Sequence, residues 1–331
     1  MRILLTGATG LVGSALCPLL RSRGHELRAL VRSTSDAAGV DLARIEVVRG
    51  NLLERESLAG AVRGVDAVIH AAGVLLDRDE ESMRRVNVDG THALLDAIRA
   101  SGSRPRFVHV STIAAGGFGT SQHPLREDQS PRPATTCGRT RLEAEEVVRE
   151  HASRLSCTSL RLPLVYGPRD RLLPPLYRLI AFGLRPMPER GEVEMSLVFV
   201  EDAAEAVALV VEKDRTSHPA YYLSQGRPVA WRRLCSAIEA ALGRSVSFPV
   251  SVGRSLLARA EGLLDRAPFL PRSVEHRLPP DLCPDLARLL LGRGLVCDGS
   301  LISEETGWTA RTGLEAGLGR TMAWLRDHGR L

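Results

Sequence analysis

A glycine-rich turn near the start of the chain limits the folds open to this sequence more than any other feature. The apolar segment Arg2–Thr6 predicts a short strand, a turn with glycines at every third position follows it, and an amphipathic segment then runs to about Arg23. Such glycines allow a tight turn, close approach of the backbone to a pyrophosphate, and packing of the helix on the strand. The following helix N-terminus adds amide donors for phosphate. The residues assigned to this predicted dinucleotide site are Gly7, Thr9, Gly10, Leu11, Val12 and Gly13.

Alternating strand and helix patterns continue through the first half of the chain, as a parallel sheet requires. Further strands are predicted at the apolar runs Glu26–Val31, Ile45–Val48, Asp66–His70 and Arg106–Ser111. The pattern predicts an α/β fold with a Rossmann-type, doubly wound parallel sheet over residues 1–160. Residues 161–331 are expected to form a smaller, mostly substrate-binding C-terminal part. We expect a strand near 196–200 to return to the Rossmann sheet.

The end of the second predicted strand bears on which nicotinamide cofactor binds. An acidic residue there would accept hydrogen bonds from the adenosine ribose, whereas Arg32 and Ser33 offer donors and positive charge suited to a 2′-phosphate. The alternative is that Arg32 is an ordinary exposed residue, because Lys213 is the only lysine in an arginine-rich chain. We favour NADP(H) over NAD(H). Further cofactor contacts are expected after the next two strands, at Asn51, Leu52, Ala71, Ala72 and Gly73.

Residues 137–145 read Cys-Gly-Arg-Thr-Arg-Leu-Glu-Ala-Glu. This segment resembles the Tyr-Gly-x-Thr-Lys-Leu-Glu-Ala-Glu helix of the extended short-chain dehydrogenase/reductases, the family of nucleotide-sugar epimerases, dehydratases and hydroxysteroid-type dehydrogenases. Residues 159–168 resemble that family's Leu-Arg-x-Pro-x-Val-Tyr-Gly-Pro turn, which implies that Pro163 and Val165 line the nicotinamide amide. The ending resembles the dihydroflavonol-reductase and 3-beta-hydroxysteroid-dehydrogenase branch. The resemblance covers nearly the whole chain and implies a nicotinamide-binding Rossmann fold.

Within this resemblance, Cys137 and Arg141 stand where the family has its catalytic tyrosine and lysine. The family's tyrosine hydroxyl exchanges a proton with the substrate oxygen, and the lysine lowers the tyrosine pKa and binds the nicotinamide ribose. A thiol has a suitable pKa of about 8.5. Its sulfur, however, lies only about 2.8 Å from Cα, whereas a phenol oxygen lies roughly 6.5 Å away. A bridging water would be needed. Arg141 keeps its charge and can still donate to ribose hydroxyls.

Four other residues are candidates for roles at the active site. Thr112 matches the family's hydroxyl that orients the substrate carbonyl, although it is equally compatible with a loop cap. Tyr177 and His123 lie in segments expected to border a substrate cleft, and either is a possible substitute proton donor. The Asn-x-x-Gly-Thr pattern at Asn87 implies an asparagine that braces the central helix, with an exposed helix residue as the alternative.

Three functional hypotheses follow. The first is an NADP(H)-dependent oxidoreductase or epimerase that acts on a small hydroxyl or carbonyl compound. The second is a catalytically silent NADP(H)-binding sensor or assembly protein, which the missing tyrosine favours. The third, a scaffold that binds no nucleotide, is disfavoured by the intact glycine turn.

Composition excludes several other classes. The net charge is +5, but the arginines are interspersed with acids and aromatic residues make up only 4%, so no nucleic-acid partner is expected. No apolar run has the length of a membrane span and no signal peptide precedes the first strand, which predicts a cytoplasmic protein. Six widely spaced cysteines predict neither a metal site nor disulfides.

Two further expectations concern partners. By analogy with the family, a homodimer is plausible through the segments Met83–Ile98 and Cys137–His151. Arginines spread over residues 254–277 could bind an anionic substrate or membrane headgroups, although a solvated face is the commoner role of such residues.

Overall fold

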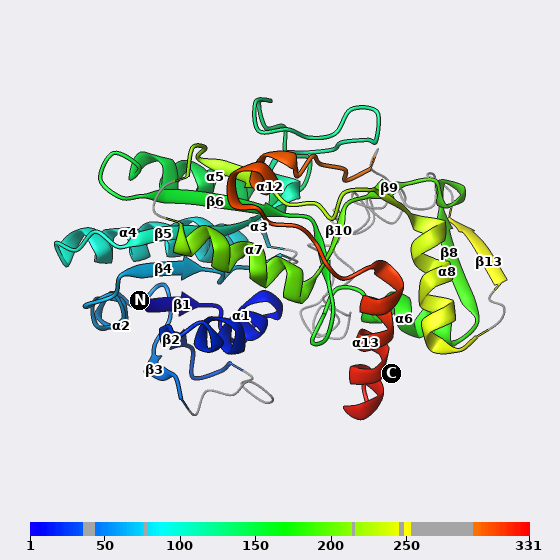
Figure 1. Cartoon of the computed structure of the whole chain (residues 1–331), viewed down its shortest axis with the longest axis horizontal. Helices are drawn as coiled ribbons and strands as arrows, with labels where there is room; N and C mark the ends of the chain where they lie inside the picture. Colours follow the sequence, from blue (N-terminus) through cyan, green and yellow to red (C-terminus); the bar gives the residue numbers. More distant parts are fainter. Residues whose placement is uncertain (36–43, 76–78, 214–215, 245–247, 253–293) are drawn as a thin grey trace.

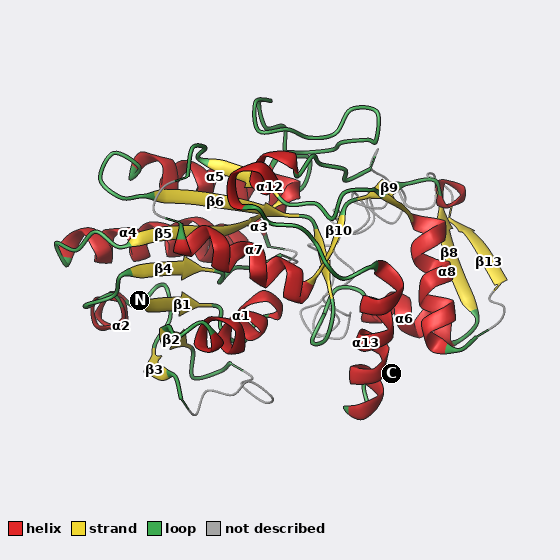
Figure 2. Cartoon of the chain, viewed as in Figure 1, coloured by secondary structure: helices red, strands yellow, loops and turns green. Residues whose placement is uncertain are grey.

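The computed structural model describes residues 1–35, 44–75, 79–213, 216–244, 248–252 and 294–331. Its larger part is a seven-stranded sheet in the order β11-β6-β5-β4-β1-β2-β3, in which every neighbouring pair is parallel (Figures 1 and 2). This is the predicted doubly wound Rossmann-type sheet. The strands are β1 (Arg2–Thr6), β2 (Glu26–Val31), β3 (Glu46–Arg49), β4 (Ala67–His70), β5 (Arg106–Thr112), β6 (Cys157–Leu162) and β11 (Ala220–Tyr222).

Helices cover both faces of this sheet, and the strand side chains alternate between them. Leu5 points into a core shared with α1 (Leu11–Ser22) and α7 (Val200–Glu212), while its neighbour Leu4 points into the opposite core. That second core is closed by α2 (Arg55–Ala61), α4 (Gly90–Ala100) and α5 (Thr136–Glu150). Because both faces are covered by helices, the central strands are rich in buried apolar residues, and such apolar runs predict strands from the sequence.

The segment Met83–Ile98 does not form one regular α-helix. The structure has α3 (Glu80–Arg84), one π-helical turn at Arg85–Asp89, and then α4. A π-helical turn inserts a residue into the regular spacing and is frequent at functional sites. Here it contains Asn87, whose side chain is fully buried.

The smaller part of the molecule, here called the second lobe, has its own hydrophobic core at the right of Figure 1. Within the described residues it contains three two-stranded sheets. Their strands are β7 (Leu164–Tyr166) with β10 (Leu197–Phe199), β9 (Glu194–Met195) with β12 (Val229–Ala230), and β8 (Leu184–Pro188) with β13 (Phe248–Val252). The helices that pack on them are α6 (Pro174–Ala181), α8 (Trp231–Leu242) and α13 (Leu314–Asp327). Three further short helices are η2 (Ile113–Ala115) after β5, η3 (Glu189–Gly191) between β8 and β9, and α12 (Ser300–Thr306) before α13.

The expectation that a strand near 196–200 rejoins the Rossmann sheet is wrong. That segment is β10, and it pairs with β7 in a separate sheet. The edge of β6 that an added strand would need is occupied by β11, so the chain returns to the large sheet about twenty residues later than expected. The arginines spread over residues 254–277 lie outside the described residues.

The structure bears on one of two predictions, the absence of a membrane-spanning segment, and does not test the other, the homodimer. No helix in the described ranges is long and apolar enough to cross a membrane. The homodimer expected through Met83–Ile98 and Cys137–His151 stays a prediction, since the structure is that of a single chain.

Candidate cofactor and active site

The glycine turn has the backbone geometry that a dinucleotide site needs. Gly7 has φ of 75°, in the left-handed region, and a Cβ there would lie 2.6 Å from the carbonyl carbon of Ala71. A Cβ on Gly13 would lie 2.0 Å from the carbonyl oxygen of Gly7. Gly10, the N-cap of α1, makes no side-chain capping bond, so the first amides of the helix keep their donors for a ligand.

The predicted cofactor residues converge at one edge of the sheet. Parallel pairing sets Thr6 beside Leu30 on one side and His70 on the other, so the segments that follow β1, β2 and β4 all start from the carboxyl edge. Arg32 and Ser33 are exposed there. The exposed Arg32 side chain is accessible to a phosphate.

Asn51 and Leu52 lie at the same edge but are differently placed. The Asn51 side-chain oxygen accepts a hydrogen bond from the amide of Leu53 (2.7 Å), and its amide donates to Glu54. Asn51 therefore orders its own loop. Leu52 is buried beneath Gly90 of α4, where a Cβ would come within 3.0 Å of it.

Arg141 is a buried cation with an incomplete set of hydrogen bonds. Only 4% of it is exposed, Nη1 donates to the carbonyl oxygen of Val110 (3.3 Å), and Nε has no partner. Its guanidinium lies directly against Gly73, because a Cβ on Gly73 would be 1.9 Å from Nη2. Burial lowers the pKa of Arg141, while the nearby Cys137 thiol raises it. A buried guanidinium with an unsatisfied donor, beside the strand-end loop, fits a ligand that carries hydroxyl acceptors.

Cys137 lies one helical turn before Arg141 on the same face of α5. It is buried, with 6% of its surface exposed. The helix start is fixed by Thr135, whose hydroxyl accepts a hydrogen bond from the amide of Gly138 (3.0 Å). The thiol is therefore held at a rigid position from which it cannot reach outward as a tyrosine would.

A buried chain of hydrogen bonds connects β1 to the start of the π-helical turn. Thr91 Oγ1 donates to the carbonyl of Asn87 (2.6 Å), so it accepts from Nε2 of His70 (3.0 Å). The other ring nitrogen, Nδ1, then accepts from Thr6 Oγ1 (2.7 Å), which itself accepts from the amide of Ala72 (3.3 Å). Burial, helped by the charge of Arg141, lowers the pKa of His70 to about 3. His70 is thus a neutral ring in one tautomer.

Asn87 continues this chain to the dyad helix. Its oxygen accepts from the amide of Val74 (2.8 Å), and its NH₂ donates to the carbonyl of Val74 and to Thr140 Oγ1 (both 3.0 Å). Thr140 in turn donates to the carbonyl of Cys137 (3.2 Å). The bracing role implied by the family resemblance is confirmed, and the alternative of an exposed helix residue is wrong.

A buried ion pair that sequence reasoning missed lies one turn beyond Arg141. Arg161 on β6 makes bidentate contact with Glu145 on α5, with Nη2 to Oε2 at 2.7 Å. Glu145 also accepts from Ser111 (2.5 Å), and Arg161 donates to the hydroxyl of Tyr222 (2.8 Å). Burial acts to lower the pKa of Arg161, but the bonds and charge of Glu145 outweigh it and raise that pKa. The pair fixes α5 to the sheet. The sequence signal for this ion pair was an acidic residue eight positions after Cys137, two helical turns further along α5.

Thr112 and His123, two other predicted catalytic residues, lie in different surroundings. Thr112 ends β5, and its hydroxyl accepts from the amide of Ala114 (3.3 Å), which is the capping role; its own proton stays available for a substrate oxygen. His123 is exposed on a turn closed by mutual backbone bonds with Thr120.

Tyr177 does not border an open cleft. It is 1% exposed in the core of the second lobe, and its hydroxyl donates to the carboxylate of Asp170 (3.5 Å). Burial raises its pKa well above the usual range, and Asp170 adds to this. The apolar periodicity of α6 turns Leu176, Tyr177 and Ile180 inward, which explains why a tyrosine expected at a cleft is in a core.

Asp170 itself gives a prediction about pH. Burial raises the pKa of Asp170 to about 7, against opposing backbone hydrogen bonds, whereas an unfolded aspartate titrates near 3.9. Between those values the folded state binds a proton that the unfolded state lacks, so stability falls as pH rises through this window and levels off above it. Asp170→Asn should flatten the decline, by up to about 1.4 kcal/mol per pH unit, in urea unfolding at pH 5 and pH 8. Asp327→Asn, on the exposed side of α13, is the control. An unchanged pH profile in Asp170→Asn would contradict the assignment.

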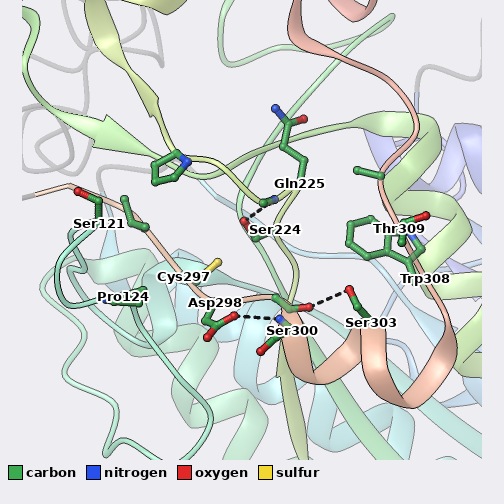
Figure 3. A pocket seen from close by; sticks show the side chains of 15 residues that line it. Ser121, Pro124, Ser224, Gln225, Cys297, Asp298, Ser300, Ser303, Trp308 and Thr309 are labelled. Carbon is green, nitrogen blue, oxygen red and sulfur yellow. Dashed lines mark hydrogen bonds between the residues drawn. The ribbon is translucent and has the colours of Figure 1, made fainter.

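Two cavities lie away from the dyad. One, of about 470 Å³, is lined by residues that follow β11 and surround α12, among them Ser224, Cys297 and Ser303 (Figure 3). The other, of about 700 Å³, runs between α1 and α7 and includes Leu11 of the glycine turn. Neither is lined by Cys137, Arg141 or Thr112.

Comparison with known sequences decides the family. A sequence profile described as the NAD dependent epimerase/dehydratase family matches residues 3–223, which is about two thirds of the chain. The chain belongs to the NAD-dependent epimerase/dehydratase family. This agrees with the resemblance seen at the glycine turn and at residues 137–145, and it supports a nicotinamide cofactor for this chain.

Three proteins of known name resemble the chain along most of its length. It is 31% identical to 2-alkyl-3-oxoalkanoate reductase of Stenotrophomonas maltophilia, over 75% of this chain and 79% of that protein. It is 28% identical to sterol demethylase protein B of Methylococcus capsulatus, over 99% of both chains. It is also 28% identical to 4-hydroxy-2-methyl-3-oxo-4-farnesyl-3,4-dihydroquinoline-1-oxide ketoreductase of Stigmatella aurantiaca, over 96% and 95%.

Among solved structures, the fold matches that of DesIV, a dTDP-glucose 4,6-dehydratase from Streptomyces venezuelae. The two share 24% identity with a TM-score of 0.79, over 99% of this chain and 97% of DesIV. At that level of identity the likeness concerns the fold, and it covers the second lobe as well as the large sheet.

Proposed function

We propose that this member of the family binds NADP(H) and performs little or no hydride transfer, so that it acts as a cofactor-dependent sensor or assembly protein. The observation that carries this proposal is the surroundings of Cys137. The thiol is buried at the start of α5, and neither candidate substitute is brought to it, because Tyr177 is sealed in the second lobe and His123 is on an exposed turn. General acid–base catalysis needs a group within hydrogen-bond reach of the reacting oxygen.

The cofactor contacts that we propose follow from the residues at the sheet edge. The turn residues Gly7–Gly13 would hold the diphosphate, and Arg32 with Ser33 the 2′-phosphate. Arg141 would donate from its unpartnered Nε to ribose hydroxyls, and Pro163 and Val165 would line the amide. When bound, the nicotinamide ring supplies the position from which a hydride is donated or accepted.

A second candidate function is an NADP(H)-dependent oxidoreductase on a lipophilic hydroxyl or carbonyl compound. The free proton of Thr112 favours it, since that hydroxyl can still orient a substrate oxygen. In this reading a water beside Cys137 relays the proton that the tyrosine would give. The three relatives above support a lipophilic substrate, as they are named for an alkyl-oxoalkanoate, a sterol and a farnesylated quinoline.

Turnover by the wild-type protein separates the two. The full-length protein is mixed with NADPH and a 2-alkyl-3-oxoalkanoate, and the loss of absorbance of NADPH is followed over many hours. If NADPH is lost no faster than in the absence of protein, and NADPH binding is measurable, the result supports a catalytically silent NADP(H)-binding protein. Multiple turnovers would contradict the silent function and support the oxidoreductase. Absence of any nucleotide binding would contradict both proposed functions.

The preference for NADP(H) gives a further prediction. Arg32→Ala should weaken NADPH binding by roughly 10- to 100-fold, because one charge-assisted contact with a phosphate is worth about 1.5–3 kcal/mol. NADH affinity should change by less than about threefold, since NADH has no 2′-phosphate. The control is Arg104→Ala, an exposed arginine at the opposite end of β5. Equal losses for both nucleotides would show that Arg32 does not read the 2′-phosphate.

A further inference from the structure

An unusual share of the exposed apolar surface is gathered at one end of the second lobe. Among the described residues nine large hydrophobic side chains are exposed, and five of them belong to α6, β8, β13 and the turn between α6 and β8. We call this surface the apolar tip; it consists of Leu179, Phe182, Leu184, Phe248 and Val250. Scattered exposed hydrophobics are normal, whereas a contiguous group marks an interaction surface.

The tip is contiguous because two segments distant in sequence are paired. β8 and β13 are parallel neighbours with Leu184 opposite Phe248, and the amide of Phe248 donates to the carbonyl of Gly183 (2.9 Å). Val250 lies two residues along β13, on the same face as Phe248. Phe182 is 81% exposed and Phe248 74%. Two phenyl rings are therefore presented to solvent at this end of the lobe.

The opposite face of β8 packs against α8, so the apolar tip is the solvent-exposed face of this strand. Arg185 alternates with Leu184 and reaches Glu239 of α8 (3.3 Å). Trp231 of the same helix donates to the carbonyl of Pro186 (2.7 Å). In Figure 1 β13 is the outermost strand of the second lobe, at the end of the molecule far from the large sheet.

Three exposed arginines lie on or next to the elements that form or adjoin the tip. Arg178 on α6, Arg190 on η3 and Arg244 after α8 are exposed, and none makes an ion pair with another described residue. The guanidinium of Arg244 lies near Gly183, 3.9 Å from the place of a Cβ there. The nearest acid of α8, Glu239, is already paired with Arg185. Exposed aromatic rings bordered by uncompensated arginines are complementary to an anionic, partly apolar surface.

We propose that the apolar tip inserts into the surface of a lipid bilayer containing anionic phospholipids, with Arg178, Arg190 and Arg244 against the headgroup phosphates. A second copy of this chain fits the surface less well, because an isologous contact would bring the same unpaired arginines together. This inference concerns a surface far from the cofactor site and is independent of the proposed function.

The test is flotation of the full-length protein with vesicles of phosphatidylcholine alone and of phosphatidylcholine with phosphatidylglycerol. Wild-type protein should float with the anionic vesicles and at least tenfold less with the neutral ones. Phe182→Ser and Phe248→Ser should each lower the partition coefficient about tenfold, and Arg178→Glu with Arg244→Glu by more than about tenfold. Matched controls are Leu331→Ser, an exposed leucine at the C-terminus, and Arg104→Glu.

Melting temperature and NADPH affinity are measured on every variant, and both should stay at the wild-type values because the substituted side chains are exposed. Failure of the wild-type protein to float with anionic vesicles would overturn the proposal. So would equal flotation of the tip variants and the controls. A dimer in sedimentation that Phe248→Ser dissociates, without vesicle binding, would assign the tip to self-association instead and would equally overturn it.

Discussion

Cys137→Tyr combined with Arg141→Lys is expected to give turnover of NADPH at least about 100-fold above the wild-type rate, since a positioned general acid contributes typically 10²–10⁴-fold. The phenol would extend from the start of α5, and the lysine would stand one turn on, where Arg141 now lies against Gly73. The supports of that helix, Asn87 and the Glu145–Arg161 pair, are already in place. The assay is NADPH oxidation with 2-alkyl-3-oxoalkanoates as substrates.

Two controls make this result interpretable. Cys137→Phe with Arg141→Lys fills the same space without a hydroxyl and should remain inactive. Cys137→Ser alone restores a hydroxyl that is too short and should also remain inactive. If the double variant binds NADPH but turns it over no faster than the wild type, the missing tyrosine is not what limits the chemistry. That result would contradict the proposal that its loss makes the protein catalytically silent.

Gly13→Ala is expected to weaken NADPH binding by on the order of 100-fold or more and to lower the melting temperature by several degrees. The added Cβ would lie 2.0 Å from the carbonyl oxygen of Gly7, a distance that real contacts do not reach, so the backbone of the turn must move. Backbone strain of this kind belongs to the mechanisms that give the largest effects of single substitutions. Calorimetric titration and thermal unfolding measure the two effects.

Gly60→Ala is the matched control for that change, because a Cβ on Gly60 in α2 would meet nothing within 4 Å. It should leave NADPH affinity unchanged and should stabilise or hardly alter the fold. Wild-type affinity in Gly13→Ala would show that the glycine turn does not hold the cofactor.

The parts of this molecule that follow from short-range patterns could be predicted from the sequence. The strands of the large sheet are buried on both faces, so Arg2–Thr6 and Arg106–Ser111 read as apolar runs, and Gly13 marks a contact within a few residues of chain. The Asn87 pattern predicted a brace that the structure confirms. In each case the signal and its structural cause lie in neighbouring residues.

Features that depend on distant segments could not be predicted in the same way. β10 reads as a strand, but its partner was decided by β11 already occupying the edge of β6. Tyr177 was expected at a cleft and lies in a core, because the burial of α6 is set by a lobe assembled from residues far along the chain. The neutral tautomer of His70 depends on Thr6 and Thr91, which no local pattern joins.

The most direct test of the account is a calorimetric titration of the wild-type protein with NADPH, repeated with NADH. We predict a micromolar dissociation constant for NADPH, clearly tighter than that for NADH, because Gly7–Gly13, Arg32 and Arg141 would each contact the cofactor. Absence of NADPH binding would contradict it, since the silent reading and the oxidoreductase reading both require an occupied cofactor site.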